Sequence, residues 1–470
     1  DNFTDVTLQE RISVFNKWNF NRKSEKEFTL AGRFFYEDRW GGEMQWNKSY
    51  RGGNEVYGES IYTTRFEFLG KYQLPVKENM FVSFSATAHD QNSVYGTTLY
   101  LAQQKIGFGQ YTWDKKLKIH NLLFGAAFRH QFYNDNTSAT INADKSNIYS
   151  VFLQDEIKLA EKHHLLLGTR YDYNNNHGSI FTPRIAYKWN PTPNDVFRIN
   201  AGTGFRIVNL FTEEHAALTG AREVIIAENL APEKSYNVNL NYLKKIRFED
   251  ASFLGFELSA WYTYFTNQII PDYDTNPNQI IYKNLNGYSE TIGISGNIDW
   301  VSPYGIKSII GFTVMDPKNV QNGIATQPIL TEKYSINWTI SYDIPNWYLS
   351  IDYTGSLYGP MRLPLLGPLD PRAEYSQPWS LQNIQFTYKK FRNFELYGGI
   401  KNILNWTPNK GNPFLIARAE DPFDQNVTYD TNGNVMATPS NPYALTFDPT
   451  YVYAPNQGIR GFLGLRYTLY

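Results

Sequence analysis

Cysteine is absent from the 470-residue sequence, which excludes disulfide bonds, cysteine nucleophiles and thiolate metal sites. No run of about 18 apolar residues occurs, so a membrane-spanning helix is excluded, whereas a membrane-spanning β-strand of about ten residues with alternating polarity is not. Neither sign of charge dominates, because 44 basic and 45 acidic residues give a formal net charge of −1. This balance gives no indication of a nucleic-acid partner.

Motifs of catalysis are missing as well. The sequence has neither a Gly-x-Ser-x-Gly nucleophile elbow nor a phosphate-binding P-loop. Its seven histidines are scattered and never adopt the His-Glu-x-x-His spacing of a zinc site. The adjacent pair His163 and His164 falls in a predicted turn, where exposed polar residues are ordinary. We therefore predict that the protein is not an enzyme.

Aromatic residues and alternating polarity, in contrast, are abundant. Phe, Trp and Tyr make up 16% of the sequence, as in proteins that place aromatic girdles at two lipid interfaces. The segment 333–343, KYSINWTISYD, places apolar and polar side chains at alternating positions, which is the period of a β-strand. Such a strand fits either a soluble sandwich or a membrane barrel, in which the apolar face meets lipid and the polar face meets a wet lumen.

The same alternation recurs along the chain and predicts about 19 strands. They lie near 9–20, 27–38, 58–74, 79–90, 97–113, 118–134, 146–158, 163–174, 180–189, 195–204, 233–248, 251–267, 283–300 (interrupted), 306–316, 331–343, 346–357, 377–390, 393–403 and 457–470. Short turns, such as 75–79, alternate with mostly longer loops, such as 205–232 and 404–456. Short periplasmic turns and long exterior loops are typical of outer-membrane barrels and not of sandwiches. The predicted fold class is all-β, a transmembrane antiparallel β-barrel whose apolar face meets lipid.

Six parts of the sequence carry motifs of a known family. The final GLRYTLY, which ends in an aromatic residue, is similar to the C-terminal assembly signal of outer-membrane barrels. The internal stretches are 149–174 (YSVFLQDEIKL, then LLLGTRYDYN), 182–211, 231–240 (APEKSYNVNL), 282–300 and 398–406 (GGIKNILNW). Together they resemble the TonB-dependent outer-membrane receptors, nearest to those of the Bacteroidetes type. One departure is Val208, which stands where the family's Phe-Arg-x-Pro loop box has proline and argues against a haem receptor.

The resemblance implies a 22-stranded barrel that is filled by an N-terminal plug domain. Even-numbered strands of that scheme run towards the periplasm, as the first predicted strand does here, so residues 1–470 are expected to form approximately strands 4 to 22 of the barrel. An open sheet would leave two unpaired edges in lipid. The plug and the first strands are therefore expected to lie outside this numbering.

The resemblance also implies a function in the bacterial outer membrane, which is active import of a scarce nutrient. A small-molecule ligand would bind the exterior loops and the plug, and the TonB–ExbB–ExbD complex would supply the energy. We expect a metal-bearing chelate, either a corrinoid such as cobalamin or an iron–siderophore. An oligosaccharide or peptide importer that works with a surface-exposed lipoprotein remains an alternative. A passive porin or structural surface barrel is the alternative from a different class.

Seven residues of the predicted long loops are candidate ligand contacts. They are Arg206, His215 and Arg222 from one loop, Trp46 and Tyr50 from a second, and Trp406 and Arg418 from the last. The basic residues would meet a charged group, and the aromatic residues would stack on a flat or bulky ligand. Solvated loop residues held by salt bridges, and girdle residues at the membrane interface, are the alternative explanations for them.

Three carboxylates, Glu420, Asp421 and Asp424, lie close together in the last long loop. Carboxylates at this spacing can hold Ca²⁺, although the ligand spacing of an EF-hand is absent. Calcium in this extracellular loop is thus an open alternative. Otherwise we expect no resident cofactor or metal.

Overall fold

The computed structural model describes residues 4, 6–137, 140–208, 223–276, 279–365, 367–408, 410, 427–431, 434–445 and 453–469. One antiparallel sheet of twenty strands dominates it, and β18 (Ile324–Thr326) is a three-residue extension of the β17 hairpin. The other strands pair with their neighbours in chain order. They are β1 (Leu8–Asn19), β2 (Phe28–Gly42), β3 (Gly58–Gln73), β4 (Asn79–Tyr95), β5 (Thr98–Leu117), β6 (His120–Asp135), β7 (Asp144–Ala160), β8 (His163–Asn174), β9 (Gly178–Thr192), β10 (Asp195–Arg206), β12 (Glu233–Arg247), β13 (Phe253–Asn267), β16 (Gly287–Val301), β17 (Ile306–Gln321), β19 (Tyr334–Ile344), β20 (Leu349–Tyr358), β21 (Trp379–Phe391), β22 (Phe394–Lys401) and β25 (Arg460–Tyr467).

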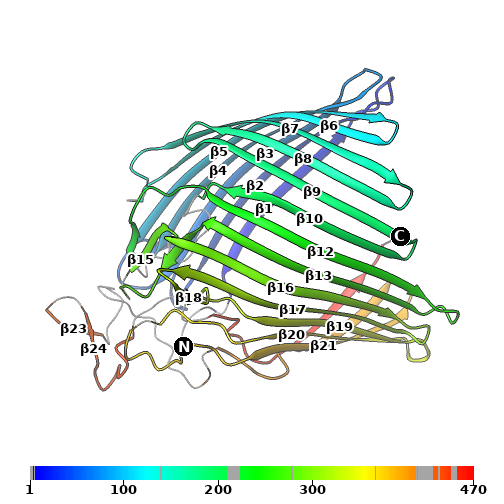
Figure 1. The fold of residues 1–470 in the computed structure, drawn as a ribbon. Coiled ribbons are helices and arrows are strands. Elements are labelled where there is room, and N and C mark those ends of the chain that lie inside the picture. The colour runs from blue at the N-terminus through cyan, green and yellow to red at the C-terminus, as the bar shows by residue number, and fades with distance from the viewer. Residues whose placement is uncertain are drawn as a thin grey trace.

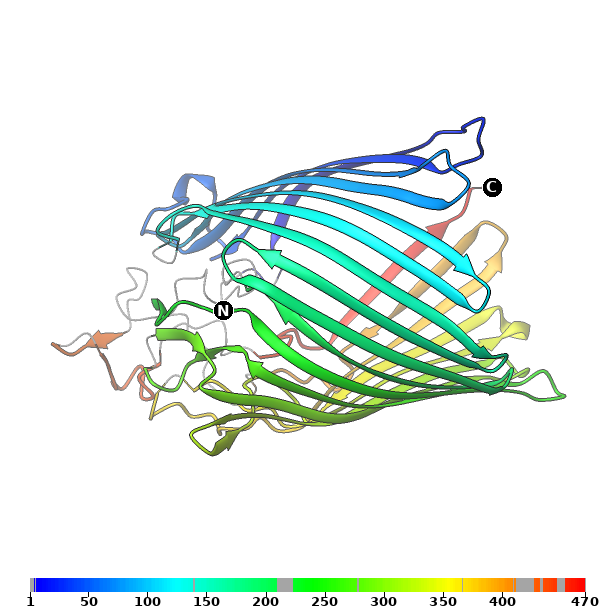
Figure 2. The same ribbon diagram turned by 45° about the horizontal axis from the view of Figure 1, so that its top comes forward.

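The sheet curls into the wall of a barrel, with tight hairpins gathered at one end and mostly longer connections at the other (Figures 1 and 2). We call these ends the short-turn rim and the long-loop rim. The described residues of β1 and β25 are not paired with each other, and every residue of β1 is exposed. The all-β fold class, and the strand positions expected from alternating polarity, are confirmed.

The two faces of the wall differ in polarity from strand to strand. On one face, Phe312, Ile336 and Leu357 are direct cross-strand partners, and on the other face Gly311, Asn337 and Ser356 are partners. One cavity is lined both by polar-face residues of β5 and β6 and by the end of β10, which lies several strands away. Residues so far apart along the sheet meet only on its concave side. The polar face is therefore the concave, interior face. The apolar face is therefore convex. Closely spaced aromatic rings lie on this apolar face. Near the short-turn rim these rings are those of Trp189, Phe197, Tyr242 and Phe256.

A second, smaller sheet lies at the long-loop rim, and we call it the cap. It consists of β11 (Glu223–Ile226), β14 (Ile269–Asp272) and β15 (Gln279–Asn284). Strand β15 is central, parallel to β11 and antiparallel to β14. The predicted interrupted strand 283–300 corresponds to the end of β15 and the whole of β16, so the interruption is the passage from the cap into the wall.

The remaining elements are short. They are β23 (Thr428–Tyr429), β24 (Val435–Met436) and the 3₁₀-helices η1 (Lys48–Tyr50) and η2 (Pro345–Trp347). Within the described residues, no helix has the length and apolar character needed to span a membrane. The elements at the long-loop rim, and the interior face below them, therefore frame any site in this part of the chain.

Candidate functional site

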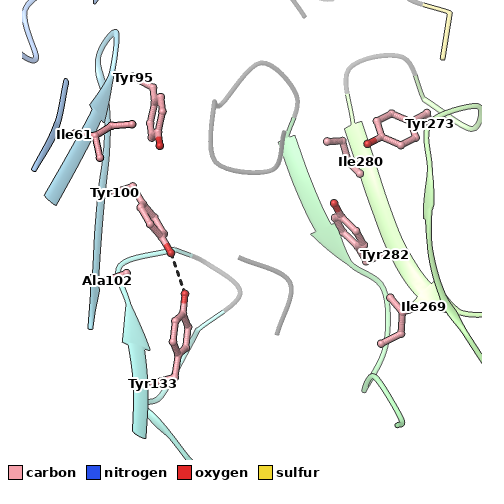
Figure 3. Close-up of a cluster of buried hydrophobic side chains, with 9 residues drawn as sticks. All are labelled: Ile61, Tyr95, Tyr100, Ala102, Tyr133, Ile269, Tyr273, Ile280 and Tyr282. Carbon is pink, nitrogen blue, oxygen red and sulfur yellow. Dashed lines mark hydrogen bonds between the residues drawn. The ribbon is translucent and has the colours of Figure 1, made fainter. Parts of the chain in front are cut away.

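The cap packs against the wall through a cluster of buried apolar side chains. The wall contributes Tyr95, Tyr100 and Tyr133 from β4, β5 and β6, and the cap contributes residues of β14 and β15 that include Ile280 and Tyr282. Figure 3 shows the two groups facing each other, with the hydroxyl groups of Tyr100 and Tyr133 in a 3.0 Å hydrogen bond. The cap thus extends from the β12–β16 part of the rim towards β3–β6.

An interior cavity of about 470 Å³ lies beside this cluster, and we call it the arginine pocket. Strands β5 to β8 provide most of its lining, and the segment from Phe205 to Val208 provides the rest, which is the last two residues of β10 and the two residues after it. Val208 also packs against the buried cluster. Three guanidinium groups line this one cavity, those of Arg129, Arg170 and Arg206.

Each arginine of the pocket is held by its neighbours. Arg170 donates from Nε to both oxygens of the fully buried Asp172 at 2.9 Å, and from Nη2 to Ser150 Oγ at 2.7 Å. Because Asp172 is compensated in this way, its burial carries no unpaired charge. Arg206 Nε donates to the buried carboxylate of Glu233 at 2.7 Å. Among the described residues, Arg129 bonds to one amide group, since its Nη2 lies 3.0 Å from Gln131 Oε1.

Positive charge continues on the interior face below the pocket. Arg184 donates to the amide of Gln154, and Arg198 donates to the amide of Asn241 at 3.0 Å. Within the described residues, Arg129, Arg184 and Arg198 have no carboxylate within 4.0 Å. Two acidic residues line the pocket: Asp172, which is paired with Arg170, and Asp144, which accepts a hydrogen bond from Asn176. This wall can therefore bind an anion with several charge-assisted hydrogen bonds.

Of the four predicted contact residues that the structure describes, Arg206 is the one that lines the pocket. Trp46 is buried in the β2–β3 connection, where its indole covers Gly58, and Tyr50 ends η1 in the same connection. Trp406 stacks on Trp379, with ring centroids 4.8 Å apart, and belongs to an aromatic row at the rim. His215, Arg222 and Arg418 lie outside the described residues, as do the predicted calcium ligands Glu420, Asp421 and Asp424.

Arg129 and Arg170 were missed by the sequence reasoning. Both occupy polar positions of predicted strands, and charge at such positions is the signal that could have identified them. Among the described residues, no group of three or more His, Asp or Glu side chains is arranged to hold a metal ion. Anion binding is thus the chemistry that the described site supports.

The family model of the TonB dependent receptor-like beta-barrel matches residues 2–403. A curated relative, the iron-regulated outer membrane virulence protein of Vibrio cholerae serotype O1, is 26% identical over 257 residues, which are 50% of this chain and 38% of the relative. The chain thus matches less than half of that relative's length.

Solved structures share the fold at low sequence identity. The FrpB iron transporter of Neisseria meningitidis has a TM-score of 0.62 at 11% identity, with 85% of this chain and 68% of that chain covered. The siderophore receptor PiuA of Acinetobacter baumannii has a TM-score of 0.61 at 13% identity, with 85% and 71% covered. The Vibrio relative is described as a protein of the outer membrane, where this barrel also resides. By the match of the family model and the curled antiparallel sheet, the chain belongs to the TonB-dependent receptor β-barrels of the outer membrane.

Proposed function

We propose that the protein is a TonB-dependent importer of a negatively charged iron chelate. The observation that carries this proposal is the arginine pocket, where Arg129, Arg170 and Arg206 line one cavity on the interior face of the wall. Relatives described as iron-regulated, as an iron transporter and as a siderophore receptor support iron as the metal. The long-loop rim would face the outside, so that the pocket receives ligand from the medium.

In this scheme the chain binds and orients the ligand, and the TonB–ExbB–ExbD complex supplies the energy. Guanidinium groups suit the catecholate or carboxylate oxygens of a ferric chelate, because each presents several N–H donors in a fixed plane. Asp172 and Glu233 hold two of the three guanidinium groups at set positions before the ligand arrives. Such preorganisation lowers the cost of binding.

The arginine pocket favours an anionic iron chelate over a corrinoid, the other metal-bearing ligand under consideration. Arg170 and Arg206 also neutralise buried carboxylates, but Arg129 has no carboxylate partner among the described residues, and a pocket built for a neutral ligand has no need of that charge. A surface-exposed lipoprotein partner would be expected if the protein imported an oligosaccharide or a peptide instead. A porin would not depend on TonB, so the energy requirement separates that alternative from import.

The test uses cells that produce the whole receptor and two radioactive probes, ferric enterobactin and cyanocobalamin. Wild-type cells should bind ferric enterobactin and accumulate it, and a protonophore should abolish accumulation but not binding. Arg129→Gln should weaken binding by about tenfold, the scale of one lost hydrogen bond between charged groups. Arg247→Gln, which changes an exposed arginine near the short-turn rim, is the matched control and should bind normally. Uptake of cyanocobalamin instead of the iron chelate would contradict the proposal.

A further inference from the structure

An open hollow of about 660 Å³ lies on the convex face of the wall, across β1 to β6, and we call it the convex hollow. Its side of the sheet follows from alternation. Phe108 and Arg129 are cross-strand partners that line the interior arginine pocket, so the neighbouring partners Gly107 and His130 point outwards. The outward residues that line the hollow on β3, β4 and β5 are Phe66, Phe68, Ala86, Ala88, Lys105 and Gly107.

The small residues of the hollow are not required by the packing of the wall. A glycine in a strand often leaves room for a neighbouring side chain, as Gly125 does for Phe152. A Cβ added at Gly107 or Gly109 would instead meet nothing within 4 Å beyond its own chain neighbours. On a surface that faces hydrocarbon, such space is filled by acyl chains. The convex hollow therefore suits an apolar chain.

Two lysines lie at the end of the hollow nearer the long-loop rim. Lys105, Phe132 and Lys145 form one cross-strand row, and Lys105 Nζ lies 5.8 Å from the centroid of the Phe132 ring. Both lysines are exposed. Asp90 is one row nearer the rim on the same face, but within the described residues neither lysine has a carboxylate within 4.0 Å. Two cations without a counter-charge thus lie beside an apolar space.

The outward positions of β5 locate these lysines relative to the membrane. Between Lys105 and Lys115 they carry no charge, and they are Gly107, Gly109, Tyr111 and Trp113. Ten residues of a tilted strand rise about 25 Å, which is the height of the apolar band of such barrels. Lys105 is therefore at one membrane interface and Lys115 at the other, where Lys115 pairs with Glu78 at 3.4 Å. Because long loops face the exterior, Lys105 is level with the head groups of the outer leaflet.

We propose that the convex hollow binds a phosphorylated, acylated lipid of the outer leaflet. The phosphate would lie between Lys105 and Lys145, and one acyl chain would run over Gly107 towards the middle of the membrane. Charge complementarity selects this occupant over a neutral lipid, because each ammonium group presents three N–H donors. The inference goes beyond import, and it holds whichever solute the barrel transports.

Lipid binding to the whole receptor tests the proposal. The receptor is purified from outer membranes, freed of lipid in detergent and titrated with lipid A, and the complexes are counted by native mass spectrometry. The double variant Lys105→Gln with Lys145→Gln should bind lipid A about tenfold more weakly, the scale of lost charged hydrogen bonds. Gly107→Leu fills the hollow and keeps both charges, so it should weaken binding by about fivefold, the scale of one or two methylene groups.

Lys115→Gln is the matched control, because it removes an outward lysine of the same strand at the opposite interface. It should bind lipid A normally, and equal weakening in this variant would overturn the site. Equal binding of dephosphorylated lipid A would overturn the role of the lysines, and normal binding by Gly107→Leu would overturn the role of the hollow. Binding of phosphatidylglycerol as tight as that of lipid A would overturn the assignment to an outer-leaflet lipid. Heat-modifiable migration on gels verifies that each barrel is folded.

Discussion

The wall strands and the cap strands are held in place by different means. Strand β4 is paired with β5 along all of its 17 residues, and β14 is paired with β15 along only four. A wall strand also has a neighbour on its other side and an apolar face matched to lipid. The cap depends instead on individual side-chain contacts with residues outside it. The Glu233 carboxylate accepts the Ile269 amide at 3.0 Å, and Arg362 bonds to Asp274 at 2.7 Å.

This difference indicates where the molecule can move. Opening a wall strand would expose a row of unpaired backbone groups to lipid. Each unpaired group would raise the free energy by roughly several kcal/mol, because it finds no hydrogen-bond partner there. Releasing the cap breaks a few hydrogen bonds and separates the buried apolar cluster, but it leaves the hydrogen-bonded ladder of the wall intact. The cap is thus the part of the long-loop rim that can open without breaking the strand pairing of the wall.

The largest effect is expected on the lipid-facing side of the wall. Replacement of Ile340 by arginine should lower the free energy of unfolding by about 2–4 kcal/mol, because a guanidinium would be placed against hydrocarbon. The adjacent Thr339→Arg should be nearly neutral, since that side chain lies on the interior face. Equilibrium unfolding in urea from lipid vesicles measures both. Similar costs at the two positions would contradict the assignment of the faces.

A smaller effect is expected at Glu233, which joins the cap to the pocket. Glu233→Ala leaves the Arg206 guanidinium and the Ile269 amide without this acceptor, so the cap should lose about 1–3 kcal/mol of local stability. Hydrogen exchange of the amides in β14 and β15 should become faster, while exchange in β4 and β5 should not change.

Glu374→Ala is the control for the Glu233 variant, because it removes an exposed carboxylate near the cap that accepts from Arg362. Its effect should be well below that of Glu233→Ala. Equally accelerated exchange in β4 and β5 after the Glu233 change would show that the cap and the wall open as one unit.

Acid should weaken the cap before the wall. Burial raises the pKa of Asp272, but hydrogen bonds from Lys283 and Thr275 outweigh it and lower the pKa from 3.8 to about 2. Because the pKa in the folded protein lies below the unfolded value, this stabilisation is present above about pH 4 and is lost as the pH falls towards 2. Exchange of cap amides should accelerate in that window in the wild type. Asp272→Asn should remove the pH dependence, and its persistence would exclude Asp272 as the cause.

The smallest effect is expected at Arg362, whose partners Asp274 and Glu374 are exposed carboxylates. Arg362→Lys keeps the positive charge but removes one of the two N–H contacts to these carboxylates. The local stability of the cap should therefore fall by less than about 1 kcal/mol, as is usual for ion pairs with exposed members. High salt should reproduce this small change in the wild type. A loss as large as that of Glu233→Ala would mean that Arg362 is a principal anchor of the cap.

The wall strands could be predicted because their pattern is local and long. Strand 163–174 was expected from alternating side chains and has those same bounds as β8. The cap could not be predicted in the same way. Strands β11 and β14 have four residues each, too few to show a period, and β14 includes Pro271, which is uncommon in strands. The pairing of β11 with β15 also joins segments that are far apart in the sequence.

The candidate site shows the same division between local and distant information. Arg206 was expected to contact ligand because it lies in a recognisable loop motif, and it does line the arginine pocket. Trp406 was also expected there, but the nearest rings, those of Trp379 and Tyr453, place it in an aromatic row at the rim. The roles of His215, Arg222 and Arg418 stay predictions, because these residues lie outside the described part of the chain.

The sequence by itself determined which long wall strands exist and which face of each is apolar, because side chains on a strand alternate and each face must match its solvent. It also determined the family, through motifs such as APEKS at 231–235. Only the tertiary structure decided that Arg129, Arg170 and Arg206 share one pocket. The physical reason is curvature: residues on β6 and β10 come together only when the strands between them bend around a common interior.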